Sequence, residues 1–400
     1  MTACASQYDP YSHAAMSDPH ELYRALRAEG APHFLPKYNA WAFTLFDDVK
    51  AASLKEKCLD FSHGQTPGQL LLNEFIPHTF ATMNGPAHKA WRGIIAGDFT
   101  PDAVAAQVPR YRALARELWE PLRKQGRMDA YRDLANRFFC INAGYKLGLP
   151  RDDSEHMRSL IDDMLHRNPN QVGGNSERNQ SAGGALMAYL HEFVGRLRAD
   201  PARAEGFTKA YLEAEIDGHR LTDEELVWYL FSLLVLGSET TPMVIAATFY
   251  HLGQNPAQKA AVLSDNGLLR RAFFEAARYR QPTNMLARRA REDFEVGGQA
   301  IRAGQNLLFI YASANRDAKR FSDPDQFNCL REDGDPNMTF GIGSHFCLGK
   351  FVAIEAGIAI LEEVFRDITD FEVNYDRCEN SYGEHLSGFV SVPLSFTLKA

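Results

Sequence analysis

Apolar residues recur every three to four positions along most of the chain, which is the spacing of one face of an α-helix. Short runs rich in aromatic and β-branched residues interrupt this pattern and predict strands at 41–46, 294–296, 305–311 and 388–398. Neither an internal repeat nor a low-complexity linker divides the sequence. We therefore predict a mainly α fold with small β-sheets, in a single domain that spans residues 1–400.

The longest helix predicted by this pattern runs from about 222 to 252. Thr222 and Glu225 form a capping box at its start, and Gly253 and Pro256 mark its end. Its apolar run is shorter than the roughly 18 residues of a membrane span, because Gly-Ser-Glu-Thr-Thr interrupts it at 237–241. We therefore expect a buried core helix with a polar interruption in its middle.

Two polar regions lie outside the helical patterns. The stretch at 168–184 is rich in glycine, asparagine and serine and predicts a mobile loop between two helices. The first 22 residues carry Asp9, Asp18 and Glu21 and contain no apolar run. We therefore expect neither a signal peptide nor a membrane anchor.

Composition narrows the class of protein. With 400 residues, 45% hydrophobic and 24% charged, the chain can bury a large core. A formal net charge of −8 argues against a nucleic-acid partner. The six cysteines have no paired spacing, which suits a reducing compartment, and we expect a cytoplasmic protein.

The most informative segment is the run at 340–349, Phe-Gly-Ile-Gly-Ser-His-Phe-Cys-Leu-Gly, which ends where an apolar helical pattern begins. Gly341 and Gly343 let the backbone bend and pass close to a flat ligand, so that amide groups turn toward the sulfur of Cys347. These amides and the positive end of the following helix favour the thiolate. A thiolate is the ligand that pushes electron density onto heme iron to favour O–O cleavage.

Cys347 has two other interpretations. A lone intracellular cysteine is commonly a small buried hydrophobic residue. Zinc is the second, since His345 is also a possible ligand, but a structural zinc site needs four ligands and Cys329 has no C-x-x-C partner. The glycines do not form a nucleotide-binding G-x-G-x-x-G loop, because Phe346 stands at the last glycine position, and no G-x-S-x-G elbow occurs.

The ten residues match F-G-x-G-x-H-x-C-x-G, the heme-binding loop of the cytochrome P450 family, and the chain resembles that family along most of its length. The resemblance implies a P450-like domain that encloses heme b, iron protoporphyrin IX, with Cys347 as the metal ligand. It makes Phe340, Gly341 and Gly349 cofactor-binding residues of the loop. It is also typical of a bacterial member that is not bound to a membrane.

The same resemblance supplies candidates for binding the heme propionates, which need cations or hydrogen-bond donors. His88 and Arg92 form an H-x-x-x-R pattern on one face of a predicted helix. Arg288 has the spacing of the family's arginine in the strand after the E-x-x-R helix, and His345 is the fourth candidate. Each residue alone is more typical of a solvated surface, and a shift of one position would exchange Arg288 with Arg289.

The interruption in the long helix resembles the family's oxygen-activation groove, usually A-G-x-[DE]-T-T, with Glu239 and Thr240 as the catalytic acid and alcohol. Oxygen activation consumes two protons, so a hydroxyl must position water while a carboxylate relays protons from solvent. Thr240 would orient the water and Glu239 would deliver the protons. The alternative for Thr240 is a hydroxyl that bonds the carbonyl oxygen four residues back.

Two departures from the family pattern concern this groove. Leu236 stands where the family usually has a small residue, and we expect it to narrow the space above the iron. Pro242 follows the threonines, and it cannot donate to the carbonyl oxygen of Ser238. We therefore predict that the helix is opened at the groove.

Glu275 and Arg278 resemble the family's E-x-x-R pair, which we assign to folding near the heme; an exposed i, i+3 ion pair is the alternative. The family completes this pair with a cationic residue, but Gln326 stands at the apparent counterpart. Either Arg316 or Arg331 would then substitute. After Cys347 the sequence also departs from the family's G-x-x-L-A-R-x-E pattern, because residues 349–355 lack the arginine.

The resemblance implies a monooxygenase that inserts one oxygen atom from O2 into a mostly apolar small molecule, with electrons from a separate ferredoxin and its reductase. The alternatives are a heme-thiolate enzyme that uses peroxide or performs coupling or dehydration, and a non-enzymatic heme sensor or carrier. We expect the substrate wall to include 61–83, the groove helix, 283–286 and 386–389. These segments mix aromatic and aliphatic side chains with Asn73, His78 and Asn284, which is consistent with a mostly apolar ligand that carries a polar group.

Overall fold

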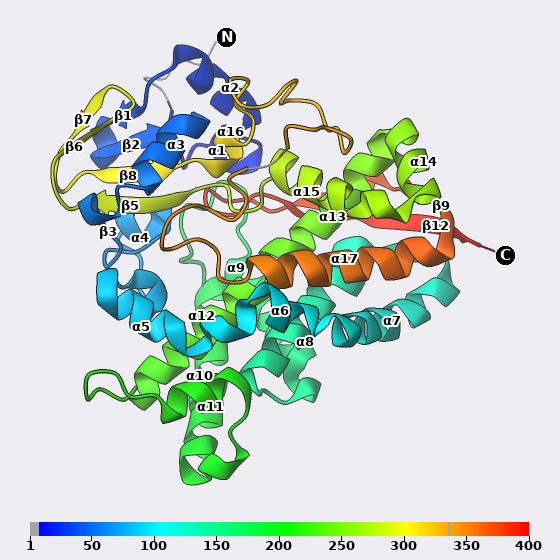
Figure 1. Cartoon of the computed structure of the whole chain (residues 1–400), viewed down its shortest axis with the longest axis horizontal. Helices are drawn as coiled ribbons and strands as arrows, with labels where there is room; N and C mark the ends of the chain where they lie inside the picture. The colour runs from blue at the N-terminus through cyan, green and yellow to red at the C-terminus, as the bar shows by residue number, and fades with distance from the viewer. Residues whose placement is uncertain (1–7, 335–336, 400) are drawn as a thin grey trace.

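The computed structural model describes residues 8–334 and 337–399. Helices form most of it, as predicted, and the small sheets gather mainly at the N-terminal side of the molecule (Figure 1). The helices are α1 (His13–Ser17), α2 (His20–Glu29), α3 (Phe46–Ser53), α4 (Pro67–Leu71), α5 (Gly85–Ala96), α6 (Pro101–Ala105), α7 (Val108–Gln125), α8 (Asn136–Leu147), α9 (Ser154–Leu165), α10 (Glu177–Ala199), α11 (Gly206–Glu213), α12 (Asp223–Ser238), α13 (Thr240–Gln254), α14 (Pro256–Ser264), α15 (Leu269–Tyr279), α16 (Tyr311–Ala314) and α17 (Lys350–Asp367). A π-helical turn, η6 (Ala130–Ala135), precedes α8.

The strands form short sheets of mixed direction. They are β1 (His33–Leu35), β2 (Ala40–Phe43), β3 (Leu59–Asp60), β4 (Arg127–Asp129), β5 (Leu286–Ala290), β6 (Phe294–Val296), β7 (Gln299–Ile301), β8 (Asn306–Phe309), β9 (Ile368–Val373), β10 (Glu379–Asn380), β11 (Phe389–Ser391) and β12 (Pro393–Leu398). The largest sheet has the order β1-β2-β8-β5-β3, in which β2 and β8 are parallel and Ala40 pairs with Asn306. A second sheet, β4-β12-β9, lies near the C-terminus.

Each predicted segment overlaps a strand of the structure. The strand at 294–296 is confirmed as β6, the segments at 305–311 and 388–398 are longer than the strands they contain, and β2 begins one residue before the segment at 41–46. The segment at 41–46 ends early because α3 begins at Phe46, whose backbone N–H donates to Asp317 Oδ2 at 2.9 Å. This side-chain cap satisfies one of the free amides at the start of the helix and fixes the turn out of the sheet.

The predicted loop at 168–184 is wrong in its second half, since α10 already begins at Glu177. The Ser176 side chain accepts a hydrogen bond from the Asn179 backbone, and the Asn179 side chain accepts one from the Ser176 backbone. This reciprocal cap offsets the low helix propensity of the glycines that follow.

The long central helix is divided at Glu239 into α12 and α13, and its C-terminal end is Gln254 rather than 252. Glu239 has φ −102° and ψ −51°, and Pro242 removes the amide that would bond Ser238, so the predicted opening is confirmed. The stretch Asp223–Gln254 is long and apolar enough to cross a membrane by length and composition, and 61% of its most apolar window is buried. A core helix of a soluble protein meets the same criterion.

The hydrophobic core holds the segment after Cys347 in place. The helix α17, which crosses the front of Figure 1, packs against α7, α13 and α15. Its buried face includes Ile354, Ile358 and Val364. Gly357 lies under Phe273, whose ring atoms would be 2.6 Å from a Cβ at this position. This close approach fixes α17 against α15, so the loop before α17 begins from a rigid element.

Candidate functional site

The loop that carries Cys347 bends as its glycines predict. The Cys347 backbone N–H donates to the Phe340 carbonyl oxygen at 2.8 Å, which closes the turn. Gly341 and Gly343 have φ values of +67° and +90°, in the region that favours glycine. A Cβ on Gly343 would also lie 2.8 Å from Glu56 Oε1 and 3.1 Å from the Ser53 carbonyl oxygen. Both glycines are therefore required by the shape of the loop.

The surroundings of the Cys347 sulfur combine burial with local donors. Burial raises the pKa of the Cys347 thiol, while the Gly349 amide, Arg92 and Lys350 oppose this rise. Cys347 is nevertheless an exposed residue. A metal ion bound to this sulfur would favour its thiolate form. The helix α17 starts at Lys350, directly after the loop, as predicted.

Three of the predicted cationic residues are brought together around an aromatic stack. The His345 ring lies between two others, with ring centroids 3.7 Å from Phe61 and 3.8 Å from His88. The Arg288 guanidinium lies over the Phe61 ring, 4.6 Å from its centroid. Residues from α5, β5 and the Cys347 loop thus meet at one place, although they are up to 257 residues apart in sequence.

Arg92 reaches the same loop from α5. Its Nη2 donates to the Phe346 carbonyl oxygen at 2.8 Å, and its guanidinium lies 4.8 Å from the centroid of the Phe346 ring. Phe340, on the other side of the loop, packs against the main hydrophobic core. Arg92 therefore ties the helix that bears His88 to the residue before Cys347.

We call these four side chains the cationic cluster, in which the two arginines carry the charge and the two imidazoles are neutral at neutral pH. Within the described part of the chain, no carboxylate lies within ion-pair distance of His88, Arg92, Arg288 or His345, and Nε2 of His88 is buried without a hydrogen-bond partner. Burial lowers the pKa of His88 to about 4 and that of His345 to about 2, and it also lowers the pKa of both arginines. Buried cations without a partner are costly, so this donor set fits an anionic group such as a pair of carboxylates.

The neighbouring Arg289 does not belong to this cluster. Its Nε donates to Asn306 Oδ1 at 3.3 Å, and its Nη1 lies 3.4 Å from His63. Successive side chains of a strand point to opposite faces of the sheet, so only one of the two arginines can face Phe61. The structure therefore distinguishes the two alternatives in favour of Arg288.

Glu239 lies at the break between α12 and α13, and its side chain is buried with 5% exposure. Tyr131 OH donates to Oε2 at 3.3 Å, while Oε1 has no partner among the described residues. Burial and the nearby Asp162 raise the pKa of Glu239 to about 8. Glu239 is therefore mainly a carboxylic acid at neutral pH and can donate a proton.

Thr240 is the first residue of α13 and is half-buried. The structure describes no hydrogen bond from its hydroxyl, whereas two nearby residues do bond carbonyl oxygens four residues back: Ser238 to Leu234 at 2.5 Å and Thr248 to Val244 at 2.8 Å. Leu236, one turn earlier, is 64% exposed. The last turn of α12 thus presents an accessible apolar residue beside a hydroxyl that is not used by the helix.

The Glu275–Arg278 pair is buried and is completed by Arg331. Arg278 donates to both carboxylate oxygens of Glu275 at 2.8 Å, and Arg331 Nε donates to Oε2 at 2.9 Å. Gln326 accepts hydrogen bonds from Arg278 and Arg331 with its backbone carbonyl oxygen, and its side chain does not join the network. Arg316 lies over the Tyr279 ring instead. The alternative of an exposed pair is therefore wrong, because the Glu275 side chain is only 2% exposed.

Asn284 is fully buried and uses both ends of its side chain within the protein, because it accepts from Tyr23 OH and donates to the Glu384 carbonyl oxygen. Sequence reasoning also missed Tyr131, since nothing near it in the sequence indicates a contact with Glu239. As for zinc, no three His, Cys, Asp or Glu side chains of the described residues are grouped to hold a metal ion.

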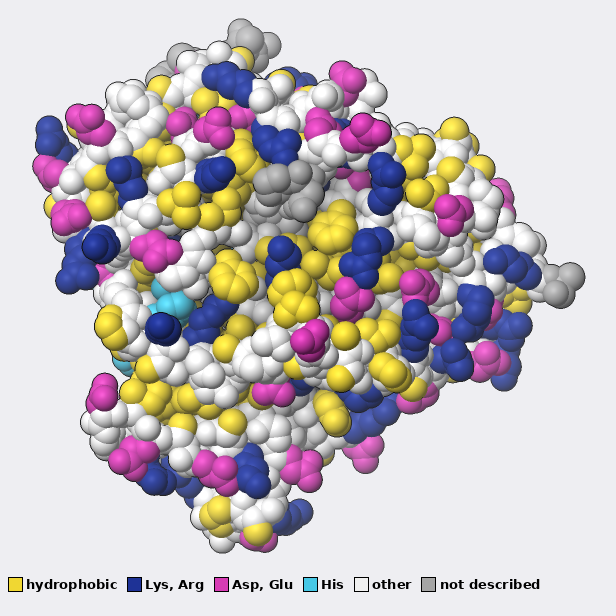
Figure 2. Space-filling model, viewed as in Figure 1, with side chains coloured by type: hydrophobic (Ala, Val, Ile, Leu, Met, Phe, Trp, Pro, Cys, Tyr) yellow, Lys and Arg dark blue, Asp and Glu magenta, His cyan; other side chains and the backbone are white. Residues whose placement is uncertain are grey.

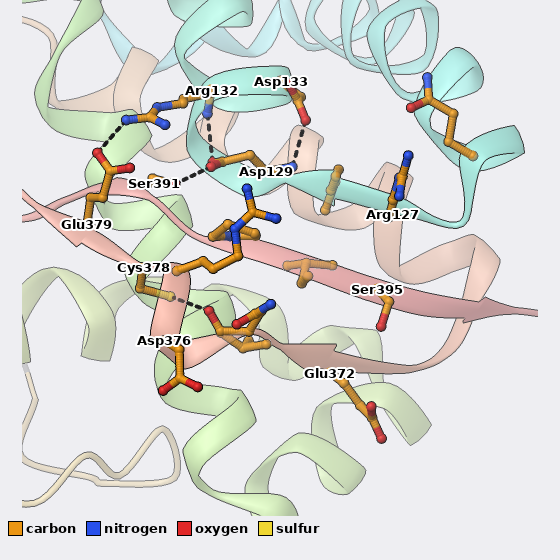
Figure 3. A pocket seen from close by; sticks show the side chains of 17 residues that line it. Arg127, Asp129, Arg132, Asp133, Glu372, Asp376, Cys378, Glu379, Ser391 and Ser395 are labelled. Atoms are coloured by element: carbon orange, nitrogen blue, oxygen red, sulfur yellow. Dashed lines mark hydrogen bonds and ion pairs between the residues drawn. The ribbon is translucent and has the colours of Figure 1, made fainter.

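An open hollow of about 950 Å³ lies apart from these residues, among β4, β9 and β12 (Figure 3). Charged side chains of both signs line it, and Arg132 pairs with Glu379 at 2.6 Å across it. None of the predicted site residues lines the hollow.

The chain is similar to known proteins over most of its length. The family model described as "Cytochrome P450" matches residues 163–399. A putative cytochrome P450 123 of Mycobacterium bovis is 30% identical over 390 residues, which cover 97% of this chain and 96% of that protein. The cyclomarin C epoxidase CymV of Salinispora arenicola is 32% identical over 73% of each chain. Among solved structures, cytochrome P450 CYP109Q5 from Chondromyces apiculatus has a TM-score of 0.84 at 26% identity, covering 99% of this chain and all of that one.

Proposed function

We propose that this chain, which belongs to the cytochrome P450 family of heme monooxygenases, inserts one oxygen atom from O2 into a mostly apolar small organic molecule. The observation that carries the proposal is the cationic cluster of His88, Arg92, Arg288 and His345 beside Cys347. Four cationic or donor side chains without a carboxylate suit a cofactor that carries two propionates and a metal ion.

The residues that would hold heme b follow from their positions. Cys347 would bind the iron, and Gly341 and Gly349 would leave the backbone on either side of it free of side chains toward the flat ring. Phe340 supports the loop from the core side. A bound heme would supply the chemistry of oxygen activation, for which the protein must provide two protons.

We assign proton handling to Glu239 and Thr240. Glu239 holds a proton at neutral pH because burial raises its pKa to about 8. The free hydroxyl of Thr240 orients water at the end of α12, and the opened backbone at Glu239 leaves carbonyl groups that water can bond. We expect Leu236, which is 64% exposed in the last turn of α12, to restrict the size of the substrate there.

For the redox partner we propose a ferredoxin-type protein, supplied with electrons by a separate reductase. Figure 2 shows Lys and Arg side chains over α7 and the C-terminal part of α17, on the face that also displays the loop before α17. Arg112, Arg116 and Lys124 of α7 have side chains that are 51%, 59% and 73% exposed, and they pair with Glu362, Glu363 and Glu120. An acidic electron carrier would bind this face by exchanging with these glutamates as partners of the cations. The five free cysteines of the described residues support an assignment to the cytoplasm.

A screen of a compound library for spectral shifts of the heme tests the substrate class. Compounds that displace water from the iron are then incubated with the protein, a ferredoxin, its reductase and isotopically labelled O2. We expect apolar compounds to be selected and one labelled oxygen atom to appear in the product. Product formed only with added peroxide, or product without the label, would favour the alternative heme-thiolate chemistries.

A further inference from the structure

The groups around the carboxyl group of Glu239 come from η6, α8 and α9. Its only described hydrogen bond comes from Tyr131 OH at 3.3 Å. The groups that face it are Tyr131 on η6, Cys140 on α8 and, from α9, Asp162 with Arg158 beside it. A buried acid needs a path by which its proton is replaced after each delivery. The contacts of Tyr131 and Asp162 indicate where this path lies.

Tyr131 is fixed by the π-helical turn that contains it. Asp129 Oδ1 accepts a hydrogen bond from the backbone N–H of Tyr131 at 2.9 Å. Figure 3 shows that the same oxygen accepts from the Arg132 N–H, at 3.0 Å, and that Asp133 Oδ2 accepts from the Asp129 N–H, at 2.7 Å. The Tyr131 ring itself is buried with 3% exposure. Single π-helical turns are frequent at functional sites because the extra residue redirects a side chain. Here the turn directs the hydroxyl of Tyr131 to Glu239.

Asp162 connects this buried pair to the surface. Asn136 Nδ2 donates to its Oδ1 at 2.9 Å, and Arg158 Nη1 approaches its Oδ2 at 3.4 Å. Its side chain is 35% exposed, so it exchanges protons with solvent. Asn136 also donates its backbone N–H to the carbonyl oxygen of Tyr131, so it holds the Asp162 carboxylate beside the π-helical turn. Asp162 is therefore the residue of this group that contacts both water and the interior.

We propose that protons reach Glu239 from the α9 side of the molecule, with Asp162 as the proton source and Tyr131 as the residue that positions the Glu239 carboxyl. This inference rests on the proposed function, because it concerns the supply of protons for oxygen activation. Each transfer moves one proton and no electron. The Glu239 carboxylate that remains after a delivery takes a proton from the Asp162 carboxyl, through water or the Tyr131 hydroxyl, and solvent returns a proton to Asp162.

Titration of Glu239 tests the arrangement without turnover. The infrared band of its protonated carboxyl is identified in the heme-loaded protein as the band that Glu239→Gln removes. Tyr131→Phe removes a hydrogen bond that favours the carboxylate, so the titration midpoint should rise by roughly one pH unit. Asp162→Asn removes a negative charge, so the midpoint should fall. The matched controls are Asp163→Asn, which removes the adjacent carboxylate that pairs with Arg178, and Tyr111→Phe, and neither should move the midpoint.

The solvent isotope effect on oxygen-dependent turnover tests the supply of protons. We expect Asp162→Asn to slow turnover at neutral pH several-fold and to enlarge the isotope effect, whereas Asp163→Asn should do neither. Equal effects of the two aspartate variants in both measurements would overturn the inference. The carbon monoxide spectrum of each variant reports thiolate-bound heme independently, so the inference can fail while the proposed function stands.

Discussion

His345 stacks on His88 with ring centroids 3.8 Å apart, although both imidazoles belong to a cluster of cationic side chains. Such contact is tolerated because burial keeps both rings neutral, with pKa values of about 2 and about 4. The stack therefore sets a flat, uncharged wall beside two permanently charged arginines, Arg92 and Arg288. Heme retention and the stability of the heme-free protein should depend on this arrangement.

Replacement of the proposed iron ligand should change the optical spectrum. The reduced carbon monoxide complex of the wild-type protein should show the red-shifted Soret band of thiolate ligation, and Cys347→Ser should lose it. Cys378→Ser serves as the control, since this cysteine is half-buried and donates to the Asn374 carbonyl oxygen. Retention of the band in the Cys347 variant would exclude Cys347 as the ligand.

The cationic cluster should have opposite effects on the heme-free and heme-loaded protein. Arg288→Met removes a buried charge without a counterion, so the melting temperature of the heme-free protein should rise. The same change should speed heme transfer to an acceptor protein by roughly tenfold to a hundredfold, because a hydrogen bond to a charged group is lost. Heme loss from Arg92→Gln and His88→Phe should also accelerate. Arg289→Gln is the control, and unchanged heme loss in all three cluster variants would contradict the assignment.

The stability of the heme-free protein should depend on pH through His88. Its pKa is lowered from 6.5 to about 4 in the folded state, so the unfolded chain binds more protons between these values. Stability should therefore be complete above about pH 6.5 and fall, by on the order of 1–3 kcal/mol, as the pH decreases toward 4. Urea unfolding at several pH values measures this slope, which His88→Phe should reduce. The exposed His78, changed to alanine, should leave it unchanged.

Removal of the Thr240 hydroxyl should uncouple the reaction. Thr240→Ala should bind substrate and accept electrons normally, but the ratio of product to electrons consumed should fall several-fold while hydrogen peroxide increases. Thr248→Ala is a suitable control because its hydroxyl bonds the Val244 carbonyl oxygen within α13. Full coupling in the Thr240 variant would show that another group orients the water.

The buried network at Glu275 should contribute strongly to folding. Arg331→Ala leaves Glu275 with one cation instead of two and should reduce the free energy of unfolding by about 3 kcal/mol or more. Arg271→Ala, on the exposed face of α15, should cost less than about 1 kcal/mol. Similar losses in the two variants, measured by urea unfolding, would contradict a special role for Arg331.

Residues within short motifs could be identified from the sequence, because their spacing already fixes their geometry. The turn of the Cys347 loop depends on two glycines in four residues, and His88 and Arg92 share a face because they are four apart on one helix. The helix opening before Pro242 likewise follows from a missing amide. These features need no knowledge of distant contacts.

Other features depend on which distant segments meet. Tyr131 contacts Glu239 across 108 positions of sequence, and a π-helical turn has no sequence signature that would have indicated it. Arg316 and Arg331 were equivalent candidates because both follow α15 at a distance, and only packing selects Arg331. Asn284 is a further example, because the sequence does not indicate that its side chain bonds Tyr23 and the Glu384 carbonyl oxygen.

The break at Glu239 also divides the central helix into parts that differ in their tolerance of change. On its C-terminal side, residues 241–249 are all buried in the core, so nearly every substitution there disturbs packing. On its N-terminal side, Leu236 and Gly237 are accessible, and the backbone discontinuity keeps their changes from propagating into α13. Directed evolution of substrate preference should therefore accept many residues at 236 while rejecting most at 243–247.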